Sequence, residues 1–275
     1  MKEFAGKVAV ITGAGSGIGR ALALELAEHG ARLALSDVDM VGLTETAEWC
    51  AKAGAEVRHY QLDVADRAAV LANAEQVAGD FGVVNLVVNN AGVALLATVA
   101  EMSWEDLEWV MNVDYWGVVH GTKAFLPHLL ASGDGHVVNL SSVFGLIGVP
   151  TQSAYNSAKF AVRGFTEALR QEMLVARAPV RVTCVHPGGI RTNIVRNARG
   201  GDANPEEASR RFHRIAHTSP EQAARIILRG VRRDRPRILV GPDAYVIDAL
   251  PRLLGPLYQR VGVAVARLGQ RFGGL

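Results

Sequence analysis

Short apolar, often β-branched runs alternate with longer amphipathic stretches over the first 190 residues of this 275-residue chain. A short apolar run predicts a buried strand, and an apolar residue at every third or fourth position predicts a helix. Strands are therefore predicted at 8–12, 32–36, 56–62, 84–88, 136–140, 180–185 and 237–240. Helices are predicted at 17–29, 39–53, 66–81, 103–131, 153–176 and 219–233.

Regular alternation of strand and helix predicts βαβ units and a parallel sheet. Several of the strands are apolar throughout, which is typical of a sheet covered by helices on both faces. We therefore predict a single α/β domain over residues 1–242, with a Rossmann-type, doubly wound, seven-stranded and mainly parallel sheet.

Two segments break this alternation. Residues 190–218 are rich in Arg, Gly and Asn, and predict a mobile flap with a short helix near 205–213. Residues 243–275 form an apolar, Arg-punctuated extension with helical spacing, in which Pro251 and Pro256 argue against one continuous helix. This extension could pack on the domain or a neighbouring subunit, cover the substrate mouth or lie on a membrane surface. We favour packing within the assembly.

Composition and charge limit the classes of binding partner that the protein can be expected to have. The net charge of +2 hides a basic segment, because residues 191–275 carry +9 and residues 1–190 carry −7. The basic segment could face an anionic partner, but pairing within the fold or oligomer is the simpler interpretation. The chain has no apolar run long enough to span a membrane and no secretory-signal layout, so we expect a cytoplasmic protein. The four tryptophans fall on predicted helices, and nucleic-acid binding is not expected.

Cysteine and histidine spacing predicts no metal centre. Cys50 and Cys184 have no paired spacing, so both are expected to be buried packing residues. His213 and His217 are four apart, but no glutamate follows His213 and no third ligand lies nearby.

A glycine-rich turn follows the first predicted strand and opens a helix. Residues 12–19 read TGAGSGIG, so Gly13, Gly17 and Gly19 give a GxxxGxG spacing around Ser16 and Ile18. Glycines allow the backbone to approach a pyrophosphate, and a helix N-terminus offers free N–H groups and the positive end of a dipole. This context predicts dinucleotide binding.

Asp37 ends the second predicted strand, twenty-four residues after Gly13. A carboxylate there can accept hydrogen bonds from the adenosine ribose hydroxyls and would repel the extra phosphate of NADP. No Arg or Lys occurs between Arg32 and Lys52. NAD is therefore predicted over NADP, although Asp37 could instead only cap the following helix.

Tyr155 and Lys159 are four apart in a helical pattern, so their side chains share one helix face. Ser142 lies thirteen residues upstream, just past the fifth predicted strand. Ligands of open α/β sheets bind outside the carboxyl ends of the strands, so Ser142 is expected where chemistry would occur.

In the order and spacing of these motifs, residues 5–240 resemble the classical short-chain dehydrogenase/reductase family. The matching residues are TGAGSGIG at 12–19, Asp63, the Asn89-Asn90-Ala91-Gly92 run, Asn112, Ser142, Tyr155 with Lys159, and Pro187-Gly188 with Ile190 and Thr192. Each motif is weak alone, whereas their joint order is specific.

The resemblance implies a role for each matching residue. It makes Tyr155 the general acid/base, with Ser142 holding the substrate oxygen and Lys159 binding the nicotinamide ribose. It implies that Asn112 holds a water molecule that links Lys159 to solvent. The implied cofactor contacts are Gly13, Ser16, Gly17, Ile18, Gly19, Asp37, Asp63, Val64, Asn90, Ala91, Gly92, Tyr155, Lys159, Pro187, Gly188, Ile190 and Thr192.

Charge arithmetic supports the role of Tyr155. A free tyrosine has a pKa of about 10, and lowering it by about three units takes about 4 kcal/mol. A lysine cation about 5 Å away supplies about 3 kcal/mol at an effective dielectric constant near 20. The positive charge of the oxidised nicotinamide can add the rest. Tyr155, Lys159 and the cofactor together are therefore adequate, and Tyr155 alone is not.

Apolar residues after Ser142 predict a hydrophobic substrate pocket. The predicted substrate contacts are Ser142, Tyr155, Phe144 and Val149, with further apolar walls from Leu95, Leu96, Leu146, Ile147 and Pro150. We expect hydride transfer between NAD(H) and a hydrophobic secondary alcohol or ketone, in a homodimer or homotetramer. The alternatives are an NADP-linked carbonyl reductase and a non-catalytic protein that senses dinucleotides.

Overall fold

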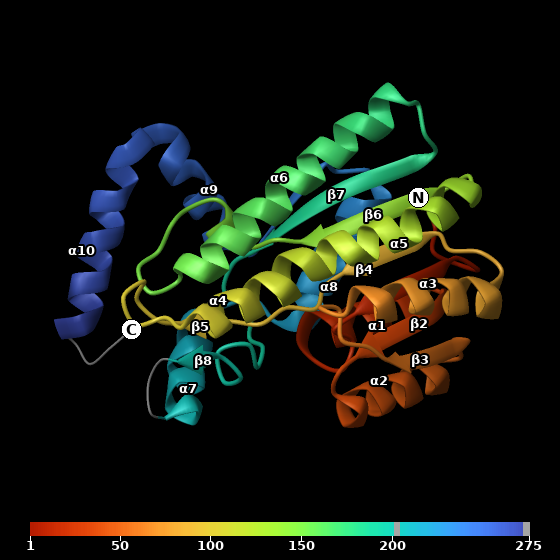
Figure 1. Ribbon diagram of the computed structural model, residues 1–275, viewed down its shortest axis with the longest axis horizontal. Coiled ribbons are helices and arrows are strands. Elements are labelled where there is room, and N and C mark those ends of the chain that lie inside the picture. The colour runs from red at the N-terminus through yellow and green to blue at the C-terminus, as the bar shows by residue number, and fades with distance from the viewer. Residues whose placement is uncertain (201–203, 272–275) are drawn as a thin grey trace.

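Seven parallel strands form the centre of the molecule, in the order β3-β2-β1-β4-β6-β7-β9 (Figure 1). The structure is a computed structural model, and it describes residues 1–200 and 204–271. The strands are β1 (Val8–Thr12), β2 (Arg32–Asp37), β3 (Val57–Gln61), β4 (Leu86–Asn89), β6 (Gly135–Leu140), β7 (Val180–Pro187) and β9 (Arg237–Val240). The predicted doubly wound, seven-stranded α/β fold is confirmed.

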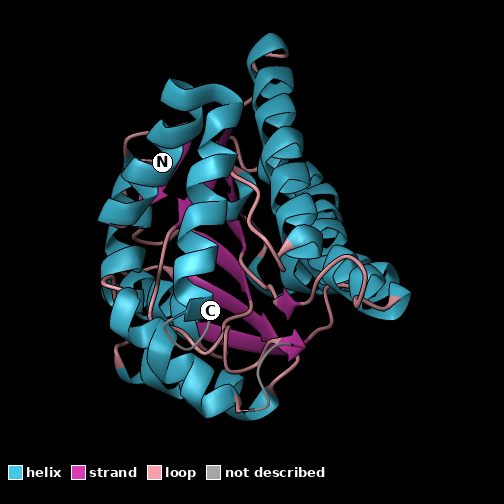
Figure 2. Cartoon of the chain, turned by 90° about the vertical axis from the view of Figure 1, so that its left-hand side faces the viewer, coloured by secondary structure: helices cyan, strands magenta, loops and turns pink. Residues whose placement is uncertain are grey.

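Helices cover both faces of this sheet (Figure 2). One layer contains α1 (Gly17–Glu28), α2 (Met40–Lys52) and α8 (Pro220–Arg232). The other contains α3 (Arg67–Phe81), α5 (Gly117–Ala131) and α6 (Ser153–Val175). Strand β1 serves both layers, since Ala9 and Ile11 pack into the first and Val8 and Val10 into the second. Burial on both faces explains why central strands such as β1 read as unbroken apolar runs, whereas the edge strand β3 is largely exposed.

The strand order reverses direction between β1 and β4, and the carboxyl ends of the strands meet along one edge. Ile11 pairs with Val88, and Leu140 pairs with Val185. Polar residues that follow these strands are thereby gathered at the switch point, where ligands of open α/β sheets bind.

The predicted helix at 103–131 is interrupted. Helix α4 (Trp104–Met111) passes through a π-helical turn, η1 (Asn112–Trp116), into α5. A π-turn adds one residue to the helical circuit and is often found at functional sites. It leaves no mark on the apolar pattern, so the sequence predicted one regular helix.

The predicted flap is anchored across the carboxyl edge of the sheet. Two short strands that were not predicted, β5 (Leu95–Leu96) and β8 (Arg199–Gly200), pair in parallel. The Arg199 guanidinium lies 3.8 Å from the centre of the Trp109 ring and 3.0 Å from Asp106 Oδ1. Helix α7 (Pro205–Ile215) follows, and confirms the short helix predicted in this segment.

The C-terminal extension forms two helices. Helix α9 (Pro242–Leu254) ends at Gly255, whose φ of +52° starts the short 3₁₀ turn η3 (Gly255–Leu257). Helix α10 (Tyr258–Arg271) then runs beside the loop that precedes α6 (Figure 1). The extension is thus not one continuous helix, as expected, but the break falls at Gly255 and Pro256, whereas Pro251 lies inside α9 without ending it. Among the described residues, no helix combines the length and apolar character needed to cross a bilayer.

Candidate active site

The glycine-rich turn between β1 and α1 has the shape of a phosphate cradle. Gly13 and Gly17 have φ values of +67° and +53°, and a Cβ on Gly13 would lie 2.8 Å from the Ala91 Cα. Ser16 precedes α1 in an extended conformation, and in the described structure its side chain makes no capping hydrogen bond. The first N–H groups of α1 are therefore left without a side-chain cap, as pyrophosphate binding at a helix N-terminus requires.

The residues after β4 hold this turn in place. Asn90 Nδ2 donates to the carbonyl oxygens of Thr12, at 2.9 Å, and Gly13, at 3.1 Å. The Thr12 hydroxyl accepts from the backbone N–H groups of Asn90, at 3.0 Å, and Ala91, at 3.1 Å. The structure thus brings the predicted Asn90 and Ala91 directly beside the glycine turn, where Asn90 braces the backbone.

Asp37 lies at the end of β2, against the same turn. Its Oδ2 accepts from the Gly15 N–H at 2.8 Å, and its Oδ1 accepts from the Asp39 N–H at 3.0 Å. Helix α2 is capped by Asp39 instead, whose carboxylate accepts from Val41 and Gly42. Asp37 is therefore not the cap of α2. Instead, the glycine-rich turn positions the carboxylate of Asp37.

Asp63 and Val64, two of the implied cofactor contacts, follow β3. Asp63 is exposed, and its carboxylate accepts from the Ala65 N–H at 2.9 Å. Val64 is buried, and a Cβ on Gly117 would lie 2.7 Å from the Val64 Cγ2. Val64 is thus packed against the start of α5.

The turn after β7 is supported by a carboxylate that sequence reasoning missed. Pro187 ends β7, and the Gly189 N–H donates to Asp243 Oδ2 at 2.6 Å. A Cβ on Gly188 would collide with the same carboxylate. Thr192 reaches the glycine turn, since a Cβ on Gly17 would lie 3.2 Å from its Cγ2. The contact with Asp243 comes from far along the chain, so no local motif could have revealed it.

The three residues predicted to carry the chemistry lie together. Tyr155 and Lys159 are one turn apart on α6, with Lys159 Nζ 5.4 Å from the centre of the Tyr155 ring. Ser142 follows β6, and a hydrogen bond links its side chain to Tyr155. The Phe144 ring meets the Tyr155 ring edge-on, with centroids 6.2 Å apart. A phenol, a hydroxyl and a cation therefore share one site.

The role implied for Asn112, holding a water molecule that links Lys159 to solvent, stays a prediction, whereas a carboxylate that was not predicted, Asp114, contacts Lys159 directly. Lys159 Nζ lies 3.0 Å from Asp114 Oδ2 and 3.4 Å from the Leu140 carbonyl oxygen. Asn112 is not among the partners of Lys159 in the described residues. Residues two apart on a helix point in roughly opposite directions, so only one of the two can face α6.

Burial changes the expected ionisation of this cluster. Burial raises the pKa of Tyr155, and the carboxylate of Asp114 adds to this rise. Lys159 and the hydrogen bond from Ser142 lower that pKa, but the balance lies above the ordinary value. Burial alone would lower the pKa of Lys159, whereas the neighbouring Asp114 holds it above its ordinary value. Neither the burial of Tyr155 nor the charge of Asp114 can be read from the spacing of Tyr155 and Lys159, so the pKa of Tyr155 expected from sequence was too low.

The loop beside the predicted pocket is held by Asn156, another residue that the sequence reasoning missed. Its Nδ2 donates to the carbonyl oxygens of Phe144, at 2.7 Å, and Ile147, at 2.8 Å. Its Oδ1 accepts from the Val149 N–H at 3.0 Å. Phe144 and Val149, the predicted substrate contacts, are half-buried, as a pocket wall requires, whereas Leu95 packs inside a buried cluster. The position of Asn156, directly after Tyr155, was the available signal.

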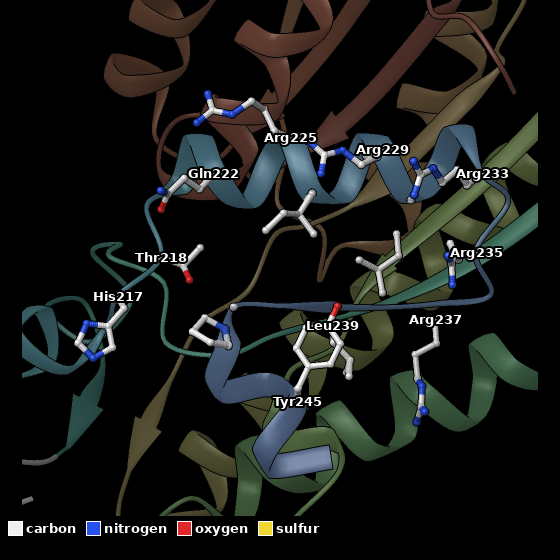
Figure 3. A pocket seen from close by; sticks show the side chains of 15 residues that line it. His217, Thr218, Gln222, Arg225, Arg229, Arg233, Arg235, Arg237, Leu239 and Tyr245 are labelled. Atoms are coloured by element: carbon white, nitrogen blue, oxygen red, sulfur yellow. The ribbon is translucent and has the colours of Figure 1, made fainter. Parts of the chain in front are cut away.

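A separate groove of about 680 Å³ lies along α8, β9 and the start of α9 (Figure 3). Arginines from α8 and from the approach to β9 line much of it, including Arg229, Arg233 and Arg235. None of the residues predicted to form the active site lines this groove. The groove is therefore distinct from the site around Tyr155.

Known proteins are similar to this chain in sequence and in fold. The family described as short chain dehydrogenase matches residues 7–203. A Mycobacterium tuberculosis protein named as an oxidoreductase, SadH, is 58% identical over 266 residues, which cover 96% of each chain. Estradiol 17-beta-dehydrogenase 11 of Mus musculus is 31% identical over 261 residues, covering 94% of this chain and 84% of that protein. A short-chain dehydrogenase/reductase from Burkholderia phymatum, solved in complex with NAD, has a TM-score of 0.85 and 34% identity, covering 92% of this chain and 95% of the other.

The parallel sheet with its glycine turn defines a Rossmann-like α/β protein. Within that class, this chain belongs to the short-chain dehydrogenase family and is an oxidoreductase. The resemblance identified from the sequence motifs is confirmed.

Proposed function

We propose that the protein transfers a hydride between NAD(H) and a hydrophobic secondary alcohol or its ketone, with Tyr155 as the general acid/base. The observation that carries this proposal is the meeting of Ser142, Tyr155 and Lys159 at the carboxyl edge of the sheet, beside the uncapped start of α1. A protein that only senses dinucleotides would not need a proton-transfer group there.

The preference for NAD rests on Asp37 and on the state of the nearest arginine. Arg20 lies next to the glycine turn and could in principle bind the extra phosphate of NADP. Its guanidinium already donates to the Gly15 and Gly42 carbonyl oxygens and lies 2.8 Å from Glu45 Oε2. Asp37 would thus repel that phosphate while the Arg20 cation is already engaged by these partners. The Burkholderia phymatum relative in complex with NAD agrees with this choice.

The residues of the chain divide the chemistry. A bound oxidised nicotinamide would supply the acceptor for the hydride of the carbinol carbon and a positive charge beside the site. The Tyr155 oxygen takes the hydroxyl proton of the alcohol in oxidation and returns a proton to the carbonyl oxygen in reduction. The Ser142 hydroxyl holds the substrate oxygen as its charge changes. Lys159 favours the phenolate form of Tyr155 by charge.

The surroundings of the site favour an apolar substrate. The Phe144 ring lies against Tyr155, and Val149 lies on the same loop, which Asn156 fixes. The hydroxyl of Tyr258 accepts from the Gly148 N–H at 3.2 Å, so the C-terminal extension also contacts this loop. The name of the murine relative, an estradiol dehydrogenase, supports a lipophilic secondary alcohol.

Exposed aromatic side chains support assembly into a homodimer or homotetramer. Trp104, Trp116 and Phe160 project from α4, η1 and α6 with 76%, 45% and 41% of their surface exposed. Large exposed apolar side chains on neighbouring helices are typical of subunit interfaces. We propose that these helices form the interface.

The proposal is tested by screening secondary alcohols and ketones for a change in nicotinamide absorbance with NAD(H) and with NADP(H). Turnover of sterol-like, long-chain or aromatic alcohols with NAD is expected, with much slower turnover of small polyols. Faster turnover of polyols would contradict the apolar pocket, and equal use of NADP would contradict the role of Asp37.

A further inference from the structure

A buried ion pair lies beneath the proposed general acid/base. Asp114 is completely buried, and the side chain of Lys159 is only 5% exposed. Their charged atoms are 3.0 Å apart, and the Lys159 nitrogen is 5.4 Å from the centre of the Tyr155 ring. Water cannot screen charges placed so deeply, so each charge acts strongly on its neighbours.

The groups that face this pair come from several elements. Asp114 Oδ1 accepts from the Val93 N–H at 2.7 Å, and a Cβ on Gly92 would lie 3.4 Å from both Asp114 Oδ1 and Lys159 Nζ. From β7, Cys184 faces Lys159, but burial raises the pKa of this thiol to about 12, so it is neutral. The Leu140 carbonyl oxygen at the end of β6 faces Lys159, and Ser142, two residues beyond the strand, faces Tyr155. Asp114 and Lys159 are thus the charges nearest Tyr155 within the described structure.

The motif resemblance implies a neutral amide, Asn112, that reaches Lys159 only through a water molecule, whereas the structure places the carboxylate of Asp114 in direct contact with Lys159. An amide would leave the lysine cation free to draw the proton from Tyr155. A carboxylate in direct contact cancels much of that cation, so Tyr155 faces a dipole rather than a full positive charge.

We propose that Asp114 is a positioning residue that anchors Lys159 and offsets its charge, so that Tyr155 releases its proton at a higher pH than it would beside Lys159 alone. This inference rests on the proposed function of Tyr155. The contact between Asp114 and Val93 extends the effect, because it ties the segment before β5 to the ion pair. The Asp114 carboxylate thereby links the backbone at Val93 to Lys159 and, through Lys159, to Tyr155.

The test is the substitution Asp114→Asn, which keeps the shape of the side chain and removes its charge. For oxidation of a secondary alcohol by NAD, we expect the midpoint of the rise of kcat/KM with pH to fall by about one unit in this variant. A midpoint that stays in place or rises would overturn the proposal. The matched control is Asp106→Asn, which removes a partly exposed carboxylate on the adjacent α4 and is expected to leave the midpoint unchanged.

A second measurement needs no turnover. The near-ultraviolet absorbance of tyrosinate is titrated in the protein and in Asp114→Asn, and the same titrations with Tyr155→Phe added isolate the signal of Tyr155. We expect the Tyr155 midpoint to fall by about one unit without Asp114, and an unchanged midpoint would refute the inference. If no alcohol is oxidised, the proposed function fails while this titration still decides the role of Asp114. Should Asp114→Asn not fold, Asp114→Ser is expected to give the same shift, and an unshifted midpoint would again refute it.

Discussion

The substitution Asp37→Ser is expected to change the choice of cofactor by an amount that follows from simple electrostatics. The carboxylate lies at the end of β2, held 2.8 Å from the Gly15 nitrogen. Two unit charges 4 Å apart at an effective dielectric constant near 20 repel each other by about 4 kcal/mol. Because Asp37 is half-exposed, salt and water reduce this to about 2 kcal/mol, or about 30-fold in binding.

The loss on the NAD side adds to this effect. Hydrogen bonds to a charged group contribute about 1.5–3 kcal/mol, so losing the carboxylate should weaken NAD binding by at least about 10-fold. The ratio of kcat/KM for NAD to that for NADP is therefore expected to fall by roughly 300-fold in Asp37→Ser.

The assay compares both cofactors with one alcohol substrate, in the protein and in Asp37→Ser. Asp39→Ser is the matched control, because it removes an exposed carboxylate two residues away whose visible role is to cap α2. The control should lose a little stability and keep its cofactor ratio. An unchanged ratio in Asp37→Ser, or an equal change in Asp39→Ser, would refute the reasoning.

Three further predictions concern stability and assembly. Burial lowers the pKa of His136 to about 3, so on acidification this histidine is protonated in the unfolded state before it is protonated in the folded state, and the free energy of unfolding falls between pH 6.5 and about 3. In urea titrations His136→Gln should reduce the slope of the free energy of unfolding against pH by about 1.4 kcal/mol per pH unit. An unaltered slope would exclude His136 as its source. Asn156→Ala leaves two carbonyl oxygens and one N–H without their partner, so the free energy of unfolding in urea should fall by about 2–3 kcal/mol. The same substitution should raise KM more than it lowers kcat. A fall in the free energy of unfolding below about 0.5 kcal/mol would contradict this role. Deletion of residues 246–275 should change the mass measured by light scattering, whereas release from lipid vesicles at unchanged mass would indicate a membrane role instead.

The sheet was predictable because its physics is local and repeated. Strands buried on both faces are apolar throughout, and β1 shows this clearly in the sequence, whereas the edge strand β3 carries exposed polar residues. The π-turn at Asn112–Trp116 and the two-residue strands β5 and β8 left no mark on the sequence, since both are set by tertiary contacts. The apolar pattern reports which segments are buried, and it is silent on irregularities of one or two residues.

The site was predictable in its residue types and less so in its charges. Spacing alone placed Tyr155 and Lys159 on one helix face and Ser142 at the end of a strand. Whether Asn112 or Asp114 faces Lys159 depends on the rotation of the helix about its axis, which the spacing of the motifs does not determine. The burial that raises the pKa of Tyr155 comes from the assembled fold, so charge arithmetic on three residues could not contain it.

The most direct test of the account measures oxidation of a secondary alcohol by NAD in Tyr155→Phe, with NAD binding followed separately. The phenol oxygen is the only atom group removed, so the account predicts at least a 100-fold loss of kcat with NAD affinity nearly unchanged. Turnover in Tyr155→Phe at the rate of the unmodified protein would show that the proton is transferred elsewhere.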